Sequence, residues 1–266
     1  MTDASRRPAV PREQNGAMTG ETTNDLGAEE PLWETHSGWW QEEFTDGADP
    51  EYEEQILPIV ERHLQGAQRV LDVGCGEGQL SRRAAGLGAQ VVGLDPTWNQ
   101  ITVARERAGG PEYARARAEQ LPCRDAAFDA VVMCLVVEHL DPFEPAIHEM
   151  ARVLEPGGIC LLLMNHPLLQ CPDSGWVDDH IMGEQYWRVG PYLPDDSNIE
   201  EVSPGVNLPF MHRPLSRYVH VMGAVGLPIE DMDEPAPPPG FLAAASEYGD
   251  ASSIPRLMVL RARRVR

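Results

Sequence analysis

The sequence predicts an α/β protein with a seven-stranded, mostly parallel sheet and helices on both of its faces. From Gln68 onward, short apolar segments alternate with amphipathic ones, which is the rhythm of strand–helix–strand units. The segments 128–136 and 159–164 are apolar almost throughout. Such segments are typical of strands that are covered on both sides of a parallel sheet, so the sheet should lie in the middle of the molecule.

The order of the elements follows from the same alternation. Strands are expected at residues 69–73, 90–94, 112–116, 128–136, 159–164, 227–232 and 256–262, and helices at 50–64, 79–87, 98–108, 141–154 and 215–225. Asp49-Pro50 opens the first helix, because aspartate is a good N-cap and proline suits the first helical position. Thr97 is the expected N-cap of the third. Pro58 predicts a kink, since proline has no backbone N–H to donate.

The chain divides into a tail and one domain. Residues 1–30 are polar and without periodicity, which predicts a disordered tail. The domain, 31–266, begins with N-terminal helices at 31–66 and carries an irregular cap over the substrate at 165–212. The tryptophans of the entry segment either close a binding site as a lid or only pack the helix; they are Trp33, Trp39 and Trp40.

Charge and composition exclude several classes of function. The chain has 42 acidic and 21 basic residues, a net charge of −21, and every basic residue is arginine. Nucleic acids and anionic membranes attract Lys and Arg, so neither is an expected partner. Lysine chemistry such as a Schiff base is excluded. The five scattered cysteines form no C-x-x-C pair, so we expect no metal and a reducing cytoplasm. The oligomeric state is left open.

The glycine-rich turn at residues 70–78 carries the chemistry. Its sequence, Val-Leu-Asp-Val-Gly-Cys-Gly-Glu-Gly, runs from a strand into a helix, and glycines let the backbone approach a ligand closely. Gln79 occupies the place of the third glycine of the dinucleotide fingerprint, which therefore fails. Asp95 follows Gly74 by 21 residues, where a carboxylate can accept hydrogen bonds from ribose hydroxyls. The pattern favours a nucleoside ligand without a pyrophosphate.

With these residues the sequence resembles the class I S-adenosylmethionine-dependent methyltransferases, in particular the small-molecule group related to quinone-biosynthesis methyltransferases. The matching segments, in the order and spacing of that family, are 71–78, 92–95, 118–122, 128–132 and 152–158. The resemblance implies a Rossmann-like fold, S-adenosyl-L-methionine as cofactor, and methyl transfer to an O, N or C atom of a small-molecule acceptor.

The resemblance also implies a role for individual residues. Those expected to bind the cofactor are Asp72, Gly74, Cys75, Gly76, Asp95, Pro96, Ala118, Glu119 and Cys134. Asp72 and the glycines would hold the methionine part, Asp95 the ribose, and Cys134 would face the sulfonium. Arg117 stands where the family often has an aspartate that binds the adenine amino group. Adenine recognition would then rest on backbone groups or on Glu119.

A general base is expected after one of the apolar strands, because ligands bind beyond the carboxyl ends of parallel strands. His166 directly follows the strand at 159–164 and is the predicted base, although it could instead only shape the loop before Pro167. His139 has a similar place after the preceding strand. Aromatic side chains of 165–212 either wall the substrate pocket or form a private core, and an excess of nine acidic residues over 165–240 favours a neutral or amine-bearing acceptor.

Two other interpretations use the same features. An enzyme of this fold could catalyse a reaction other than methyl transfer, which incorporation of a labelled methyl group would distinguish. A non-enzymatic module would bind the cofactor and have no acceptor cavity.

Overall fold

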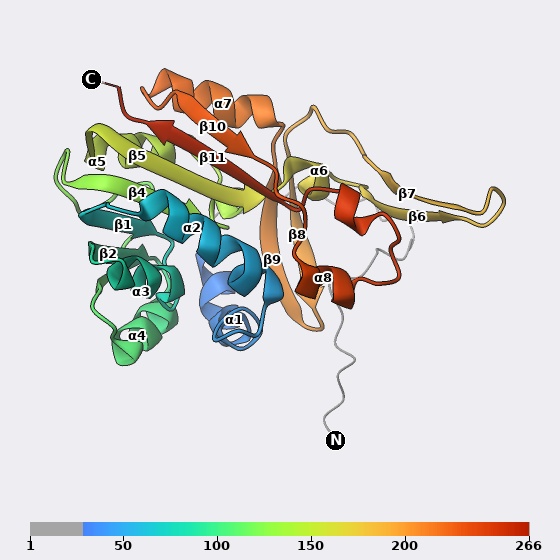
Figure 1. Cartoon of the computed structure of the whole chain (residues 1–266), viewed down its shortest axis with the longest axis horizontal. Helices are drawn as coiled ribbons and strands as arrows, with labels where there is room; N and C mark the ends of the chain where they lie inside the picture. The colour runs from blue at the N-terminus through green and yellow to red at the C-terminus, as the bar shows by residue number, and fades with distance from the viewer. Residues whose placement is uncertain (1–28, 266) are drawn as a thin grey trace.

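The computed structural model describes residues 29–265 and is built around one sheet of seven strands, whose arrangement can be followed in Figure 1. Five strands are mutually parallel: β1 Arg69–Val73, β2 Gln90–Asp95, β3 Glu112–Arg115, β4 Phe128–Cys134 and β5 Leu154–Asn165. Two more strands extend the sheet beyond β5, namely β10 Ile229–Asp233 and β11 Leu257–Arg263. The order across the sheet is β10-β11-β5-β4-β1-β2-β3, and β11 runs antiparallel to both neighbours. The predicted fold class is confirmed.

Helices cover both faces of the sheet, and the apolar strands divide their side chains between two cores. In β4, Val131 and Met133 face one core, while Ala130 and Val132 face the other, as the two-residue period of a strand requires. The first core includes side chains of α5 Glu144–Val153 and α7 Leu215–Ala224. The second includes side chains of α2 Leu57–Leu64 and α3 Gln79–Gly86.

The entry to the domain is helical, as expected, with one local difference. Helix α1 spans Glu29–Glu43, and a second helical segment starts after Asp49, whose carboxylate accepts a hydrogen bond from the Glu51 amide at 3.1 Å. This segment widens into a π-helix, η1 Tyr52–Ile56, before α2 begins. Pro58 lies in the first turn of α2, so the widened turn takes the place of the predicted kink. The tail expected at 1–30 lies outside the described residues, apart from the first two of α1.

The prediction that 165–212 is irregular is wrong. After a short helix, α6 Pro167–Gln170, the segment folds into two antiparallel hairpins: β6 Gly175–Asp179 with β7 Glu184–Arg188, and β8 Asp196–Ser203 with β9 Val206–His212. Their side chains are mostly exposed or half-buried, so the sequence lacks the apolar signal of the central strands. Figure 1 shows β6 and β7 reaching away from the body, while β9 lies beside α1. The proline-rich segment before Gly240 leads into α8 Pro239–Ala244.

Among residues 29–265, no helix is both long and apolar enough to cross a membrane.

Candidate functional site

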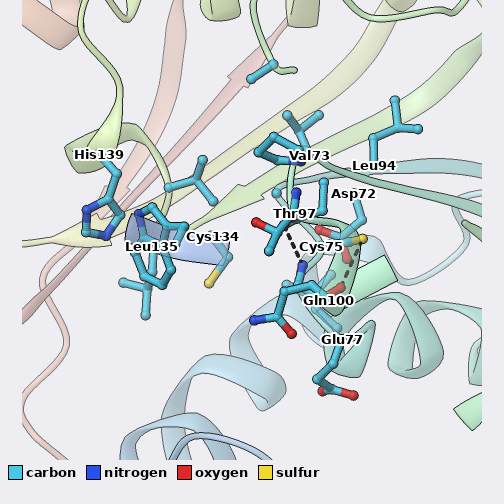
Figure 2. A pocket seen from close by; sticks show the side chains of 18 of the residues that line it. Asp72, Val73, Cys75, Glu77, Leu94, Thr97, Gln100, Cys134, Leu135 and His139 are labelled. Atoms are coloured by element: carbon cyan, nitrogen blue, oxygen red, sulfur yellow. Dashed lines mark hydrogen bonds between the residues drawn. The ribbon is translucent and has the colours of Figure 1, made fainter. Parts of the chain in front are cut away.

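A cavity lies at the carboxyl ends of the parallel strands, where β1, β2 and β4 end and the chain leaves β3 (Figure 2). The strand ends contribute residues 72–77, 94–97, 116–119, 134–136 and 139–140 to its walls, and the N-terminal helical region contributes Trp33, Trp40, Phe44, Thr45 and Tyr52. Figure 2 shows His139 and Leu135 at one end and Leu94, Asp72 and Glu77 toward the other. The cavity therefore follows the edge of the sheet in strand order.

The glycine turn forms the floor of this cavity. Gly74 has a φ of +76°, and a Cβ atom there would collide with the side chain of Val136. Gly78 has a φ of +86°, and its Cβ would collide with the ring of Tyr113. The turn is fixed to β2, because the amides of Gly74 and Cys75 both donate to the carbonyl of Leu94, at 2.7 and 3.0 Å. Larger residues at either glycine would displace the turn.

Asp95 ends β2 and braces two backbone segments of the cavity. Its Oδ2 accepts a hydrogen bond from the Gly76 amide at 3.0 Å, and its Oδ1 accepts one from the Thr97 amide at 2.8 Å. Burial raises the pKa of this carboxyl above its usual value. Each carboxylate oxygen can accept a further hydrogen bond, so Asp95 can also bind hydroxyl groups of a ligand.

Asp72 is a second buried acid, at the end of β1. Ser81 Oγ donates a hydrogen bond to its Oδ2 at 2.6 Å. Burial raises the pKa of Asp72 to about 7, since removal from water disfavours the charged form. Glu77, also buried, binds Arg82 at 2.7 Å and Arg107 at 2.8 Å and keeps its Oε1 without a partner. With Asp95 and Glu119, four acidic side chains line the cavity, and such a wall favours a positively charged ligand.

All nine residues predicted to bind the cofactor line this one cavity: Asp72, Gly74, Cys75, Gly76, Asp95, Pro96, Ala118, Glu119 and Cys134. At the end beyond β3, Arg117 lies 3.5 Å from Glu119 in an ion pair. Glu119 is thereby held near the place where the adenine was expected. Their shared location supports the predicted roles, which stay predictions.

His139 lies at the opposite end of the cavity, in the short helix η2 Val137–His139. Its ring packs between Trp33, with ring centroids 4.8 Å apart, and Phe210, at 4.6 Å. Its Nδ1 lies 2.6 Å from the carbonyl oxygen of Pro209. A carbonyl only accepts, so Nδ1 carries the proton and Nε2 keeps its lone pair. Burial lowers the pKa of His139 to about 4, and the ring is neutral at pH 7.

The backbone just before His139 is strained. Leu135, which lines the cavity at the end of β4, has a φ of +54°. A non-glycine residue in this region costs free energy and is often found at functional sites. Its amide still donates to the carbonyl of Leu163 at 2.9 Å, so the neighbouring strand holds it in place. The turn directs the chain from β4 into η2, and hence sets the position of His139.

His166, the predicted base, does not reach the cavity. The side chain is buried, and its Nδ1 accepts a hydrogen bond from the Leu168 amide at 3.1 Å, which makes His166 the N-cap of α6. Its Nε2 lies 2.7 Å from Glu234 Oε1. Both ring nitrogens are therefore engaged away from the cavity. The geometry supports the structural alternative for His166 and directs attention to His139.

The segment 165–212 does not cover the cavity directly. None of its described residues lines the cavity wall, and its contribution is indirect, through Pro209 and Phe210 against His139. The ring of Trp176 instead stacks on Tyr248 at 5.1 Å and meets Trp187 at 5.6 Å. Trp176 and Trp187 are half-buried and pack on each other and on Tyr248 rather than against the cavity, which favours the private-core interpretation for these two residues.

The N-terminal helices supply one wall of the cavity. The sequence had left open whether their tryptophans line a binding site or only pack the helix. Trp33 and Trp40 of α1 line the cavity, whereas Trp39 packs on Phe44 with ring centroids 5.2 Å apart. Tyr52 of η1 reaches the same cavity. The only sequence signal for this wall was the density of tryptophan between residues 33 and 40. Among the residues that the structure describes, no group of His, Cys, Asp and Glu is arranged to hold a metal ion.

Comparison with known proteins agrees with this geometry. Residues 71–162 match the family described as "Methyltransferase domain". Over 106 residues the chain is 40% identical to the ubiquinone biosynthesis O-methyltransferase of Agrobacterium fabrum, a match covering 38% of this chain and 42% of that enzyme. It is 37% identical over 142 residues to the malonyl-[acyl-carrier protein] O-methyltransferase of Serratia marcescens, or 53% of each chain. The chain thus spans about half the length of these curated relatives.

A solved structure extends the similarity beyond the matched segment. The S-adenosylmethionine-dependent methyltransferase from Mesorhizobium loti superposes with a TM-score of 0.67 and 25% sequence identity. The superposition covers 78% of this chain and 96% of that one. The shared part therefore includes elements outside residues 71–162.

Proposed function

The chain belongs to the class I S-adenosylmethionine-dependent methyltransferases through its residues 71–162, and we propose that it methylates a hydroxyl oxygen of a small, uncharged acceptor. One observation carries the proposal. The cavity lined by the nine predicted cofactor residues also holds a neutral histidine at its far end, with an unprotonated nitrogen.

The donor set of the cavity fits S-adenosylmethionine. This cofactor carries a sulfonium and an ammonium group, and Asp72, Glu77 and Asp95 provide carboxyl groups along the wall. Arg117 is the one arginine in the described lining, and it is paired with Glu119. A dinucleotide would place its pyrophosphate among acids without a free cation, which is unfavourable. Asp95 would bind the ribose, and Asp72 with the glycine turn would bind the methionine part.

The order of the strands supports one direction for the cofactor. With the ribose at β2, the adenine would lie toward Ala118 and Glu119 beyond β3, and the methionine toward β1 and β4. Cys134 and His139, at and after the end of β4, would then be on the side of the transferred methyl group. The bound cofactor supplies an electrophilic methyl group on sulfur. His139 Nε2 would accept the hydroxyl proton of the acceptor as general base.

The acceptor is expected to be uncharged and at least partly apolar. The wall around His139 consists of aromatic and aliphatic side chains, Trp33, Leu135 and Leu140 among them. No described lining residue at this end is an arginine, so a carboxylate acceptor would lose its hydration without gaining a partner. Both curated relatives are named O-methyltransferases. The aromatic wall favours a neutral hydroxyl compound over a carboxylate such as the malonyl group.

A test of the proposal is to incubate the protein with cofactor that carries a labelled methyl group and a panel of small acceptors. The panel pairs each neutral phenol or alcohol with a carboxylate and an amine of the same skeleton. Label in the hydroxyl compounds is the expected result. Tight binding of S-adenosylhomocysteine with no labelled product from any acceptor would instead favour the non-methylating interpretations. Label in the carboxylates alone would contradict the acceptor class.

The surroundings of the domain are part of the proposal. The net charge of −21 disfavours nucleic acid as a partner, and the protein is expected to act in the cytoplasm. Residues 31–66 would serve as the lid of the cavity, while 165–212 would support His139 from outside rather than cover the acceptor. A gel shift with RNA or DNA at submicromolar protein and near-physiological salt would contradict the expected lack of a nucleic-acid partner.

A further inference from the structure

Helix α1 is joined to α4 by a carboxylate at a helix end. Helix α4 spans Trp98–Arg107, and the amides of its first two residues, Trp98 and Asn99, donate to the two carboxylate oxygens of Glu34 at 2.7 and 3.0 Å. The first amides of a helix have no partner within it, and its N-terminus attracts negative charge. Thr97, the expected cap, makes no capping hydrogen bond with its side chain. Glu34 therefore caps α4 from a different helix.

The capped end of α4 adjoins the binding site. Asp95 and Thr97, just before Trp98, line the cavity, and the Thr97 amide binds the Asp95 carboxylate. On the other side of the junction, Trp33 precedes Glu34 directly and also lines the cavity. The Glu34 contact thus joins the ribose end of the site to the wall formed by α1.

Two further features show how α1 is held in place. Gln41 Nε2 of α1 donates to Gln100 Oε1 of α4 at 2.8 Å, and this second link lies directly after Trp40 in the chain. Gly38 is exposed in the middle of α1, and a methyl group there would have no heavy atom within 4 Å. Glycine weakens a helix interior relative to alanine, and no close packing explains it here. The helix is weak on its own and is held by contacts at its edges.

We propose that Glu34 is a positioning residue that holds α1 closed over the cofactor and thereby controls how fast the cofactor leaves. When Glu34 releases the α4 amides, Trp33 and Trp40 move away from the cavity together with α1. The cofactor is then exposed along the side of the cavity that these two rings covered. Binding and release are affected first. Glu34 does not contact His139, but Trp33 packs on the His139 ring, so that ring loses one neighbour while α1 is open.

The test is the dissociation rate of S-adenosylhomocysteine, followed by stopped-flow tryptophan fluorescence, for which Trp33 and Trp40 are reporters. Glu34→Gln removes the charge and one of the two acceptors, and should raise the rate about tenfold. Glu34→Asp keeps the charge, and its dissociation rate should lie between those of the wild type and Glu34→Gln. Glu42→Gln makes the same charge change at an exposed position of α1 and should leave the rate unchanged.

A second variant tests the same idea in the opposite direction. Gly38→Ala adds a methyl group to open space and favours the helix, so release should slow by up to about fivefold. Hydrogen exchange provides a structural readout, since the Trp98 and Asn99 amides should exchange faster in Glu34→Gln. A dissociation rate within twofold of the wild type in Glu34→Gln, with unchanged exchange at these amides, would overturn the proposal. Failure of the wild type to bind S-adenosylhomocysteine at all would instead count against the proposed function.

Discussion

His139 Nδ1 lies 2.6 Å from the carbonyl oxygen of Pro209, so a strand of an outer hairpin fixes the tautomer of a histidine inside the cavity. β9, which carries Pro209, contributes no side chain to the cavity wall. Its carbonyl nevertheless leaves Nε2 as the nitrogen with a free lone pair. The hairpin therefore determines which nitrogen of His139 keeps a lone pair, although it does not line the cavity.

Replacing His139 is the most direct test of its role. His139→Gln keeps a polar side chain but has no titratable nitrogen, and kcat on a hydroxyl acceptor should fall by about 10²–10⁴. The affinity for S-adenosylhomocysteine, measured by calorimetry, should stay within about threefold of the wild type, because His139 is not one of the predicted cofactor contacts. A variant with full kcat would leave positioning of the acceptor as the only source of catalysis.

The pH dependence of activity should report the environment of His139. Burial lowers the pKa of this histidine to about 4, so the base is unprotonated at all higher pH and is lost only below it. The acid limb of kcat should therefore lie well below pH 6, measured on brief exposure to each buffer. An acid limb near pH 6.5, the usual value for histidine, would mean that the active base is more exposed than His139.

His166→Ala should affect stability and spare catalysis. The buried ring caps α6 and contacts Glu234, and losing these bonds should lower the free energy of unfolding by about 1–3 kcal/mol. Thermal unfolding together with kcat at saturating substrates distinguishes the two roles. If kcat dropped a hundredfold while the unfolding temperature held, His166 would be restored as the base predicted from the sequence.

Asp95→Asn should weaken cofactor binding. The substitution removes the charge of a carboxyl that binds two backbone amides and is predicted to bind the ribose. We expect the affinity for S-adenosylhomocysteine to fall by about ten- to a hundredfold, or 1.4–2.8 kcal/mol, as measured by calorimetry. Asp231→Asn, the same change at an exposed site on β10, is the control. Equal affinity in both variants would remove Asp95 from the site.

The buried Asp72 should make the cofactor-free protein less stable as the pH rises. Its pKa is raised to about 7 in the folded state, so between pH 4 and 7 the unfolded chain has lost a proton that the folded chain keeps. The protonated Asp72 therefore leaves the free energy of unfolding at its highest below pH 4, and this free energy falls as the pH rises from 4 to 7. Urea unfolding should therefore show that the free energy of unfolding of the isosteric Asp72→Asn variant, relative to that of the wild type, increases by about 2–3 kcal/mol from pH 5 to pH 7. A difference in unfolding free energy between the two proteins that stays constant over this pH range would show that Asp72 titrates normally.

The central sheet could be predicted from the sequence because its signals are local and strong. The strand at 69–73 was expected at the residues where it occurs, and 90–94 and 112–116 were correct to within one residue. The hairpins of 165–212 could not be predicted in the same way. No side chain of β6, β7 or β8 is fully buried, and only β9 has buried side chains, so these strands lack the apolar run that marks the central strands, and their pairing decides their shape.

The sequence predicted that nine residues at strand ends lie together, while it could not tell which histidine lines their cavity. The glycines and acids have fixed neighbours along the chain, so their shared location can be predicted from spacing, whereas their roles toward a cofactor stay predictions. His139 and His166 both follow buried strands, and their difference depends on partners distant in sequence. His166 turns toward Glu234, whereas His139 is held by Pro209 and Trp33. No local pattern contains those contacts.

The position of β11 has a consequence for how the protein is made. β11 is the last strand of the sheet to leave the ribosome, yet it lies between β5 and β10. Until residues 257–263 emerge, β5 ends the growing sheet with an open edge and β10 has no strand to pair with. Open edges are templates for association with other chains. A nascent chain that stalls before this strand is therefore the form of the protein most exposed to aggregation and most dependent on chaperones.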